Sequence, residues 1–441
     1  MPSRQARSRQ LSSSPLDGLS TPPQLAFTKT PVVSGLSMPA DCWEVSVTQL
    51  SGLEQILWRQ LAVFATRFTR DAIDAVAAGC DIPSEQVFPL LDKLIAHELV
   101  IAEPCDDERC YRLPDAVRLV AHAQLINHDE ADDAYRSLVR YYASLAEQVL
   151  EEASGPQRAT WMRRLEREYG NLRVVLDWLV GRGDAERGLQ LAFLLQELWF
   201  EDVHTGEGRL WFAKLLALPP LSRHTALRAQ ALDLAGALAL HQDDYATASV
   251  LKEEAIALLR ELGDIARLGY VLNHHAYVVG FAQGDLRQAQ ALYQEALGYF
   301  QTLANADGTA HTLANMGTAA ILQNEYAAAR LLVAESLQMY RSLGYTYNVA
   351  LSLSRAAGIA AGTQQPERAL RLAGASAAHC ATIGVSQSRI FEEVRARLLE
   401  PARQLVSAER QTVLWEEGQA MTFEQAVMEA LDVLGVAARS M

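Results

Sequence analysis

Small and apolar residues recur at a nearly constant distance along the second half of the chain. A turn-like triplet begins at four positions whose spacings are 41, 40 and 40 residues, namely Leu262, Leu303, Leu343 and Ile383. A second turn lies between successive triplets, and an alanine follows it at a fixed offset, as Ala248, Ala289, Ala329 and Ala369. Small residues allow helices to cross closely, while larger ones fill the seam. The pattern predicts four pairs of helices over residues 226–385, which bury their apolar faces by stacking.

Helix pairs of this length resemble tetratricopeptide repeats, and the resemblance implies a right-handed superhelix whose first helices line a groove. Three amphipathic runs follow, at 390–406, 409–418 and 421–435. The last run begins with Thr422 and Gln425 at capping-box spacing. Because an array of repeats needs a cap over its last apolar face, residues 386–441 are expected to form a helical cap.

The first half of the chain lacks this repeat. Helical patterns at 51–64, 68–79 and 84–98 are followed by two β-prone runs, 99–103 and 109–113. Three helices and a hairpin are typical of a winged-helix module. We expect such a module over residues 43–126.

A helical arm is expected over residues 127–225. Its most strongly helical stretch is 161–180, in which Arg164, Arg167 and Glu168 have the spacing of ion pairs. Since the hairpin is the one β element predicted, the fold class is all-α: a winged-helix module with a small β-hairpin, a helical arm and a tetratricopeptide-like α-solenoid.

The first 42 residues have a different composition from the rest. Residues 1–40 hold six of the fifteen prolines together with eight serines, and such a segment buries too little apolar surface to fold. We expect a disordered tail over residues 1–42. An alternative role for its arginines, Arg4, Arg7 and Arg9, is contact with nucleic acid.

The overall charge argues against nucleic acid and anionic lipid as general partners. The chain has 53 acidic and 39 basic residues, a formal charge of −14. Residues 51–126 hold twelve acidic and seven basic side chains, so the predicted winged helix would repel a phosphate backbone. No run of about 20 apolar residues predicts a membrane span. Five scattered cysteines fit a reducing compartment, and we expect a cytoplasmic protein.

Four stretches together resemble one family of bacterial regulators. The run 161–178 contains Leu165-Glu166-Arg167-Glu168, Asn171-Leu172-Arg173 and Leu176-Asp177-Trp178, and the other stretches are 61–72, 111–121 and 415–426. They are similar to motifs of the signal-transduction NTPase (STAND) regulators, the large ATP-binding LuxR-, AfsR- and MalT-like transcriptional regulators. The resemblance implies the winged-helix and repeat half of such a regulator, either as an adaptor or as a split product.

Two parts of those regulators have no counterpart in this sequence. Family members carry an NTPase core before the winged helix and often a terminal DNA-binding domain. The phosphate-binding motif G-x-x-x-x-G-K-[ST] does not occur here. Neither ATP hydrolysis nor direct promoter binding therefore follows from the resemblance.

Aligning the repeats places polar residues in the expected groove. One column holds Asp233, His274, Ala314 and Ser354, and the next holds Leu234, His275, Asn315 and Arg355, with His311 on the same helix as Asn315. The candidate binding residues are Asp233, His274, His275, His311, Asn315 and Arg355. They form either a polar groove for a ligand or a set of side chains that satisfy one another or face solvent.

No catalytic or metal-binding constellation is predicted. His274 and His275 are adjacent and point about 100° apart on a helix, so they cannot easily share one metal ion. We expect no enzyme activity, no metal and no cofactor.

The function expected from the sequence is that of a non-enzymatic adaptor that binds a protein, a peptide or a small effector in a signalling or transcription-control pathway. A DNA-binding regulator that uses the winged helix and the basic tail is the rival. A partner acting in trans with a separate NTPase is a third hypothesis.

Overall fold

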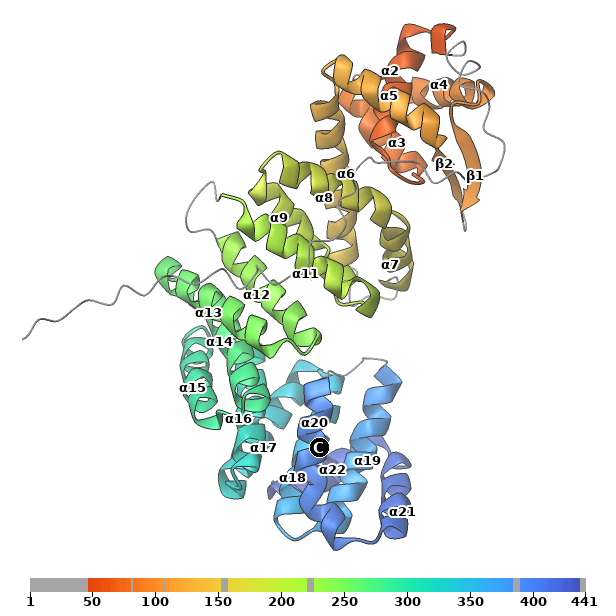
Figure 1. The fold of residues 1–441 in the computed structure, drawn as a ribbon. Helices are drawn as coiled ribbons and strands as arrows, with labels where there is room; N and C mark the ends of the chain where they lie inside the picture. Colours follow the sequence, from red (N-terminus) through yellow and green to blue (C-terminus); the bar gives the residue numbers. More distant parts are fainter. Residues whose placement is uncertain are drawn as a thin grey trace, which may run out of the picture. The chain divides into compact units, whose positions relative to one another are not determined.

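The computed structural model describes residues 47–80, 82–105, 108–151, 158–219, 226–383 and 389–436. The chain divides into two compact units, Met1–Arg223 and His224–Met441 (Figure 1). The predicted tail, 1–42, lies outside the described residues, and the predicted domain boundaries stay predictions. No helix in the described ranges combines the length and the apolar character that crossing a membrane requires.

The first unit begins with the predicted helices and hairpin. The helices are α2 (Gly52–Gln60), α3 (Arg70–Ala77) and α4 (Ser84–Ala96), with short 3-10 turns η1 (Leu61–Val63) and η2 (Ala78–Cys80), and strands β1 (Ile101–Cys105) and β2 (Glu108–Arg112) pair antiparallel. Ser51 and Glu54 form a capping box at the start of α2. The core between the helices contains Leu57, Trp58 and Phe64, each at most 2% exposed.

The arm continues this unit as a series of helices. They are α5 (Asp115–Asn127), α6 (Ala131–Glu151), α7 (Arg158–Arg167), α8 (Tyr169–Gly181), α9 (Ala185–Leu194), α10 (Gln196–Trp199) and α11 (Asp202–Ala217). The helical stretch 161–180 contributes to two of these helices, with a break between α7 and α8 at Glu168.

A buried polar network explains this break. Glu168 and Asn171 are fully buried, and the Glu168 carboxylate accepts hydrogen bonds from the Tyr142 hydroxyl at 2.8 Å and from Asn171 Nδ2 at 3.0 Å. Asn171 also binds the backbone of residues 65–67 through three hydrogen bonds.

The arginines of this stretch form ion pairs with residues far away in the sequence. Arg164 pairs with Asp71 at 2.7 Å, and Arg167 pairs with Glu108 of the hairpin. The charges of the motif thus join the arm to the helices and the hairpin that precede it.

The second unit contains the four predicted helix pairs. They are α12 (Ala226–His241) with α13 (Tyr245–Leu262), α14 (Ile265–Tyr277) with α15 (Leu286–Thr302), α16 (Ala306–Leu322) with α17 (Tyr326–Leu343), and α18 (Thr346–Gly362) with α19 (Pro366–Ile383). A π-helical segment, η3 (Val278–Ala282), extends α14. The predicted α-solenoid is confirmed.

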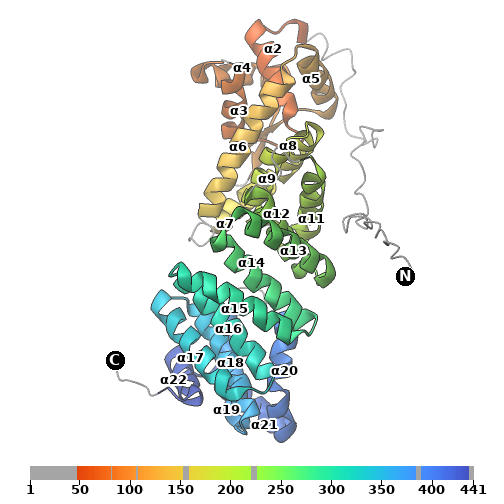
Figure 2. The same ribbon diagram turned by 90° about the vertical axis from the view of Figure 1, so that its left-hand side faces the viewer.

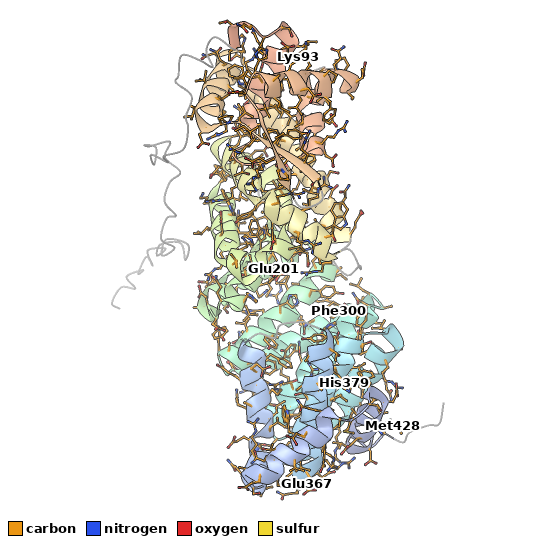
Figure 3. The ribbon with its side chains drawn as sticks, turned by 90° about the vertical axis from the view of Figure 1, so that its right-hand side faces the viewer. Lys93, Glu201, Phe300, Glu367, His379 and Met428 are labelled. Carbon is orange, nitrogen blue, oxygen red and sulfur yellow. The ribbon has the colours of Figure 1, made fainter. Side chains whose placement is uncertain are left out.

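The recurrent residues form the turns and the crossings of this array. Asp244, Asp264, Asp285 and Asn305 each cap a helix with their side chain, and the four recurrent alanines, Ala248, Ala289, Ala329 and Ala369, are fully buried. The Phe300 side chain packs against neighbouring helices at two glycines, whose missing side chains leave room for its ring. A Cβ atom at Gly269 or Gly308 would lie within 3.0 Å of the Phe300 ring, which Figure 3 labels.

Three helices follow the repeats: α20 (Arg389–Leu405), α21 (Ala408–Gln419) and α22 (Phe423–Leu434). Helix α21 packs on α19 with backbone close to backbone, because Gly374 and Gly418 lack side chains. Helix α22 packs on α17, α18 and α19, and the His379 ring of α19 meets Phe423 edge to face (Figure 3).

Helix α20 packs differently from the other two cap helices. It contacts α18 and α19 and reaches back to α16 and η3, which belong to earlier pairs (Figure 2). Its apolar side, with Val394, Leu398 and Leu399, is buried. Helix α20 therefore covers the first helices of the later repeats, on the side where the sequence predicts the groove.

Candidate functional site

Two of the predicted groove residues meet at a small cavity under α20. Asn315 of α16 and Arg355 of α18 line it together with Tyr277, Thr318 and Ser354. Its volume is about 20 Å³, and a cavity that admits one water needs roughly 10–15 Å³. The first helices thus converge on one polar spot, and α20 leaves little free space there.

The Arg355 guanidinium is held by a neutral partner. Its Nε donates to Thr318 Oγ1 at 3.1 Å, and the Thr318 hydroxyl donates to the Ala314 carbonyl at 3.1 Å. Burial lowers the pKa of Arg355, and the hydroxyls of Tyr340 and Tyr277 act in the opposite direction. Among the described residues, no carboxylate lies within ion-pair distance of this guanidinium.

The outer wall of the cavity belongs to α20. Phe391, Val394 and Leu398 contribute apolar surface, and Arg395 adds a second guanidinium, which pairs with Glu392 on its own helix. Because these residues follow no repeat, the aligned columns could not reveal them. The run 390–406 was visible only as an amphipathic helix.

His311 lies on α16 but does not line this cavity. Its Nε2 is 3.1 Å from Asn348 Nδ2 on α18, and its Nδ1 is 3.0 Å from the Asp307 carbonyl. The ring also meets Tyr340 edge to face. His311 therefore links two successive first helices, which is the self-satisfied arrangement considered in the sequence analysis.

Asp233 and His274 form a second cluster, on the first two repeats. Lys252 of α13 is buried, and its Nζ lies 2.6 Å from Asp233 Oδ1, while His274 Nδ1 lies 3.7 Å from Asp233 Oδ2. Burial acts to raise the pKa of Asp233, but Lys252 and His274 outweigh it and hold the pKa below its ordinary value. The carboxylate is thus neutralised within the array.

His275 lies in the interior rather than beside its neighbour. Its side chain is 3% exposed, with Nε2 3.7 Å from Glu253 Oε1 and no hydrogen-bond partner for Nδ1. Burial, aided by the charge of Lys252, lowers the pKa of His275 to about 4. His275 is therefore neutral at pH 7 and contributes to packing.

The first unit also has clefts, and their charge balance differs from that of the cavity under α20. Two adjoining ones, of about 330 and 490 Å³, share Arg136, Trp178 and Arg187. Arg136 pairs with Asp133 and Arg187 pairs with Asp184. These arginines are neutralised within the unit, which distinguishes them from Arg355. In the described ranges of both units, no three His, Cys, Asp or Glu residues are grouped to hold a metal ion.

Comparison with known proteins supports the repeats directly. Residues 267–342 match the tetratricopeptide repeat family. This match covers η3 and the pairs that contribute Tyr277, Asn315 and Thr318 to the cavity.

Relatives exist among proteins named as HTH-type transcriptional regulators. Those of Mycobacterium bovis and Mycobacterium tuberculosis are each 35% identical over 251 residues, which is 55% of this chain and 28% of theirs. The chain thus matches little more than a quarter of the length of these relatives.

Two solved structures are similar at low sequence identity. The STAND protein with a tetratricopeptide repeat sensor from Pyrococcus horikoshii is 13% identical, with 91% of this chain and 68% of that chain covered and a TM-score of 0.40. BtubC from P. vanneervenii is 14% identical, with 58% and 94% covered and a TM-score of 0.35.

Proposed function

We propose that this chain is a non-enzymatic regulatory protein of the cytoplasm that binds a protein, a peptide or a small effector through its tetratricopeptide array. One observation carries the proposal: the stretch that matches the repeat family also supplies polar side chains that converge under α20. Repeat arrays of this kind bind partners on the surface that their stacked helices form.

A role in transcription control rests on the relatives and the motif resemblance. The motif 161–178 and the named regulators both favour a chain that acts as the sensor half of a larger STAND-like system.

Affinity capture with the full chain tests the proposal. We expect a protein from the native host to bind the wild type, and the purified partner to bind about tenfold more weakly after Asn315→Ala with Arg355→Ala. Arg287→Ala on the exposed side of α15 is the matched control. If the partner bound the wild type, the double variant and the control with equal affinity, its binding site would lie outside the surface under α20.

DNA binding is the second candidate, favoured by the names of the relatives. The charges of the first unit oppose it, because Arg59, Arg67 and Lys93 pair with carboxylates of the same unit. A salt-sensitive shift of duplex DNA that is lost when residues 1–42 are deleted would support this candidate and weaken the first.

A further inference from the structure

Arg355 lines the cavity without an acidic partner, whereas several arginines of α19 and the cap are paired with carboxylates. Arg368 and Arg371 pair with Glu429, Arg395 pairs with Glu392, and Arg410 pairs with Glu367. No described carboxylate pairs with Arg355, and the undescribed residues of its unit, 224–225, 384–388 and 437–441, contain no Asp or Glu. A partly buried cation without a counter-ion is costly, and an anion that arrives from outside would offset that cost.

The walls around Arg355 define the chemistry of that anion. None of the cavity-lining residues is acidic, and a second guanidinium, Arg395, faces the same space. Asn315 and Ser354 add neutral hydrogen-bonding groups, while Phe281 and Phe391 are apolar. Guanidinium groups bind carboxylates in a planar, two-bond geometry, and apolar walls favour an apolar body attached to the carboxylate.

We propose that the cavity between α16, α18 and α20 binds an organic acid, with its carboxylate on Arg355 and its apolar body between α18 and α20. The inference rests on the proposed function of the array as the binding unit and names the class of effector. A free acid and the C-terminal residue of a peptide share this chemistry, and the test below distinguishes them.

Binding at this site requires α20 to move. The space present is about 20 Å³, close to the volume of one water, so an acid with an apolar body does not fit beside α20. Helices α16 and α18 are each packed between neighbouring helices of the array, whereas α20 forms the outer wall. Entry of the acid therefore displaces α20, and the position of α20 reports whether the site is filled.

The first experiment measures binding of benzoate to the full chain by calorimetry and by thermal unfolding at constant ionic strength. Benzoate should bind the wild type and the exposed control Arg287→Met with equal affinity. Its affinity for Arg355→Met should be lower by about tenfold or more. Benzamide, which has the same ring without the charge, should bind similarly weakly. If the wild type bound neither benzoate nor the peptide-end analogue described next, or if Arg355→Met bound the acid equally well, the proposal would be overturned.

N-acetylphenylalanine in the same titration represents the end of a peptide chain. Binding of benzoate alone assigns the site to a free acid, and binding of N-acetylphenylalanine alone assigns it to a peptide terminus. Without ligand, Arg355→Met should unfold at the same temperature as the wild type or a higher one, because it removes an uncompensated charge. A clearly lower unfolding temperature would show that Arg355 has a structural role and would overturn the proposal.

A reversible lock tests the movement of α20. A Cβ atom at Gly358 would lie 3.1 Å from the Leu398 Cβ, so the two helices need to separate slightly to reach the roughly 3.5–4.5 Å between the Cβ atoms of a disulfide. In Gly358→Cys with Leu398→Cys, oxidation should abolish benzoate binding and reduction should restore it. Equal binding in both states would overturn the coupling to α20. If the chain captures a protein partner but binds neither acid, this inference is wrong while the proposed function still stands.

Discussion

The helices of the first unit are joined by buried polar groups, whereas those of the second are joined by small residues that repeat. In the first unit, Tyr142, Glu168 and Asn171 form a hydrogen-bonded network inside the protein. In the second, fully buried alanines such as Ala289 and Ala329 occupy equivalent positions in successive pairs. The first arrangement fixes one particular set of helices, while the second forms a face of stacked helices, part of which α20 covers.

The largest effect is expected from breaking the polar network of the first unit. Asn171→Leu removes four hydrogen bonds and leaves the amides of Ala65 and Thr66 without their acceptor. We expect a loss of about 4 kcal/mol in the free energy of unfolding, measured by denaturant titration. Asn348→Leu, at a half-buried amide of the array, should cost about 1 kcal/mol. Equal costs would contradict the contrast between the units.

Glycine substitutions test the close packing of helices in the second unit. A Cβ atom at Gly418 would lie 2.0 Å from the Arg371 carbonyl oxygen, which cannot move away easily. Gly418→Ala should cost about 3 kcal/mol and loosen α21. Gly298→Ala, with nothing within 4 Å of the new methyl group, should instead stabilise α15 by about 0.8 kcal/mol. Thermal unfolding of both variants checks the two signs.

A smaller effect is expected from pH. The pKa of His275 is about 4 in the folded chain, below its ordinary value of 6.5, so the unfolded chain binds more protons between these values. Stability from this group is complete above pH 7 and falls by about 2 kcal/mol as the pH drops from 7 to 5. His275→Leu should lose that part of the pH dependence. An unchanged slope in the variant would show that His275 is not the group responsible.

The contrast also explains how far the sequence could predict the structure. The turns and alanines of the array recur every 40 or 41 residues, so their spacing alone located the four pairs. The partners of Asn171 lie more than 100 residues away along the chain, and no local pattern indicates them. From the sequence, Glu168 was therefore interpreted only as a member of a local ion pair.

The candidate site shows the same limit. The aligned columns found Asn315 and Arg355, which share a repeat position and meet at one cavity. They also included His275, because a column of residues does not reveal which side chain turns inward. The position of α20 depends on long-range packing, and its amphipathic pattern is equally compatible with a simple end cap.

The central claim is that this chain binds its partner through the face of the second unit under α20. Amide hydrogen exchange on the full chain, with and without the captured partner, tests it most directly. The account predicts that changes in exchange concentrate in α14, α16, α18 and α20, with α2, α3 and α4 unaffected. Protection confined to α2–α4 and the hairpin, with the array unchanged, would contradict it.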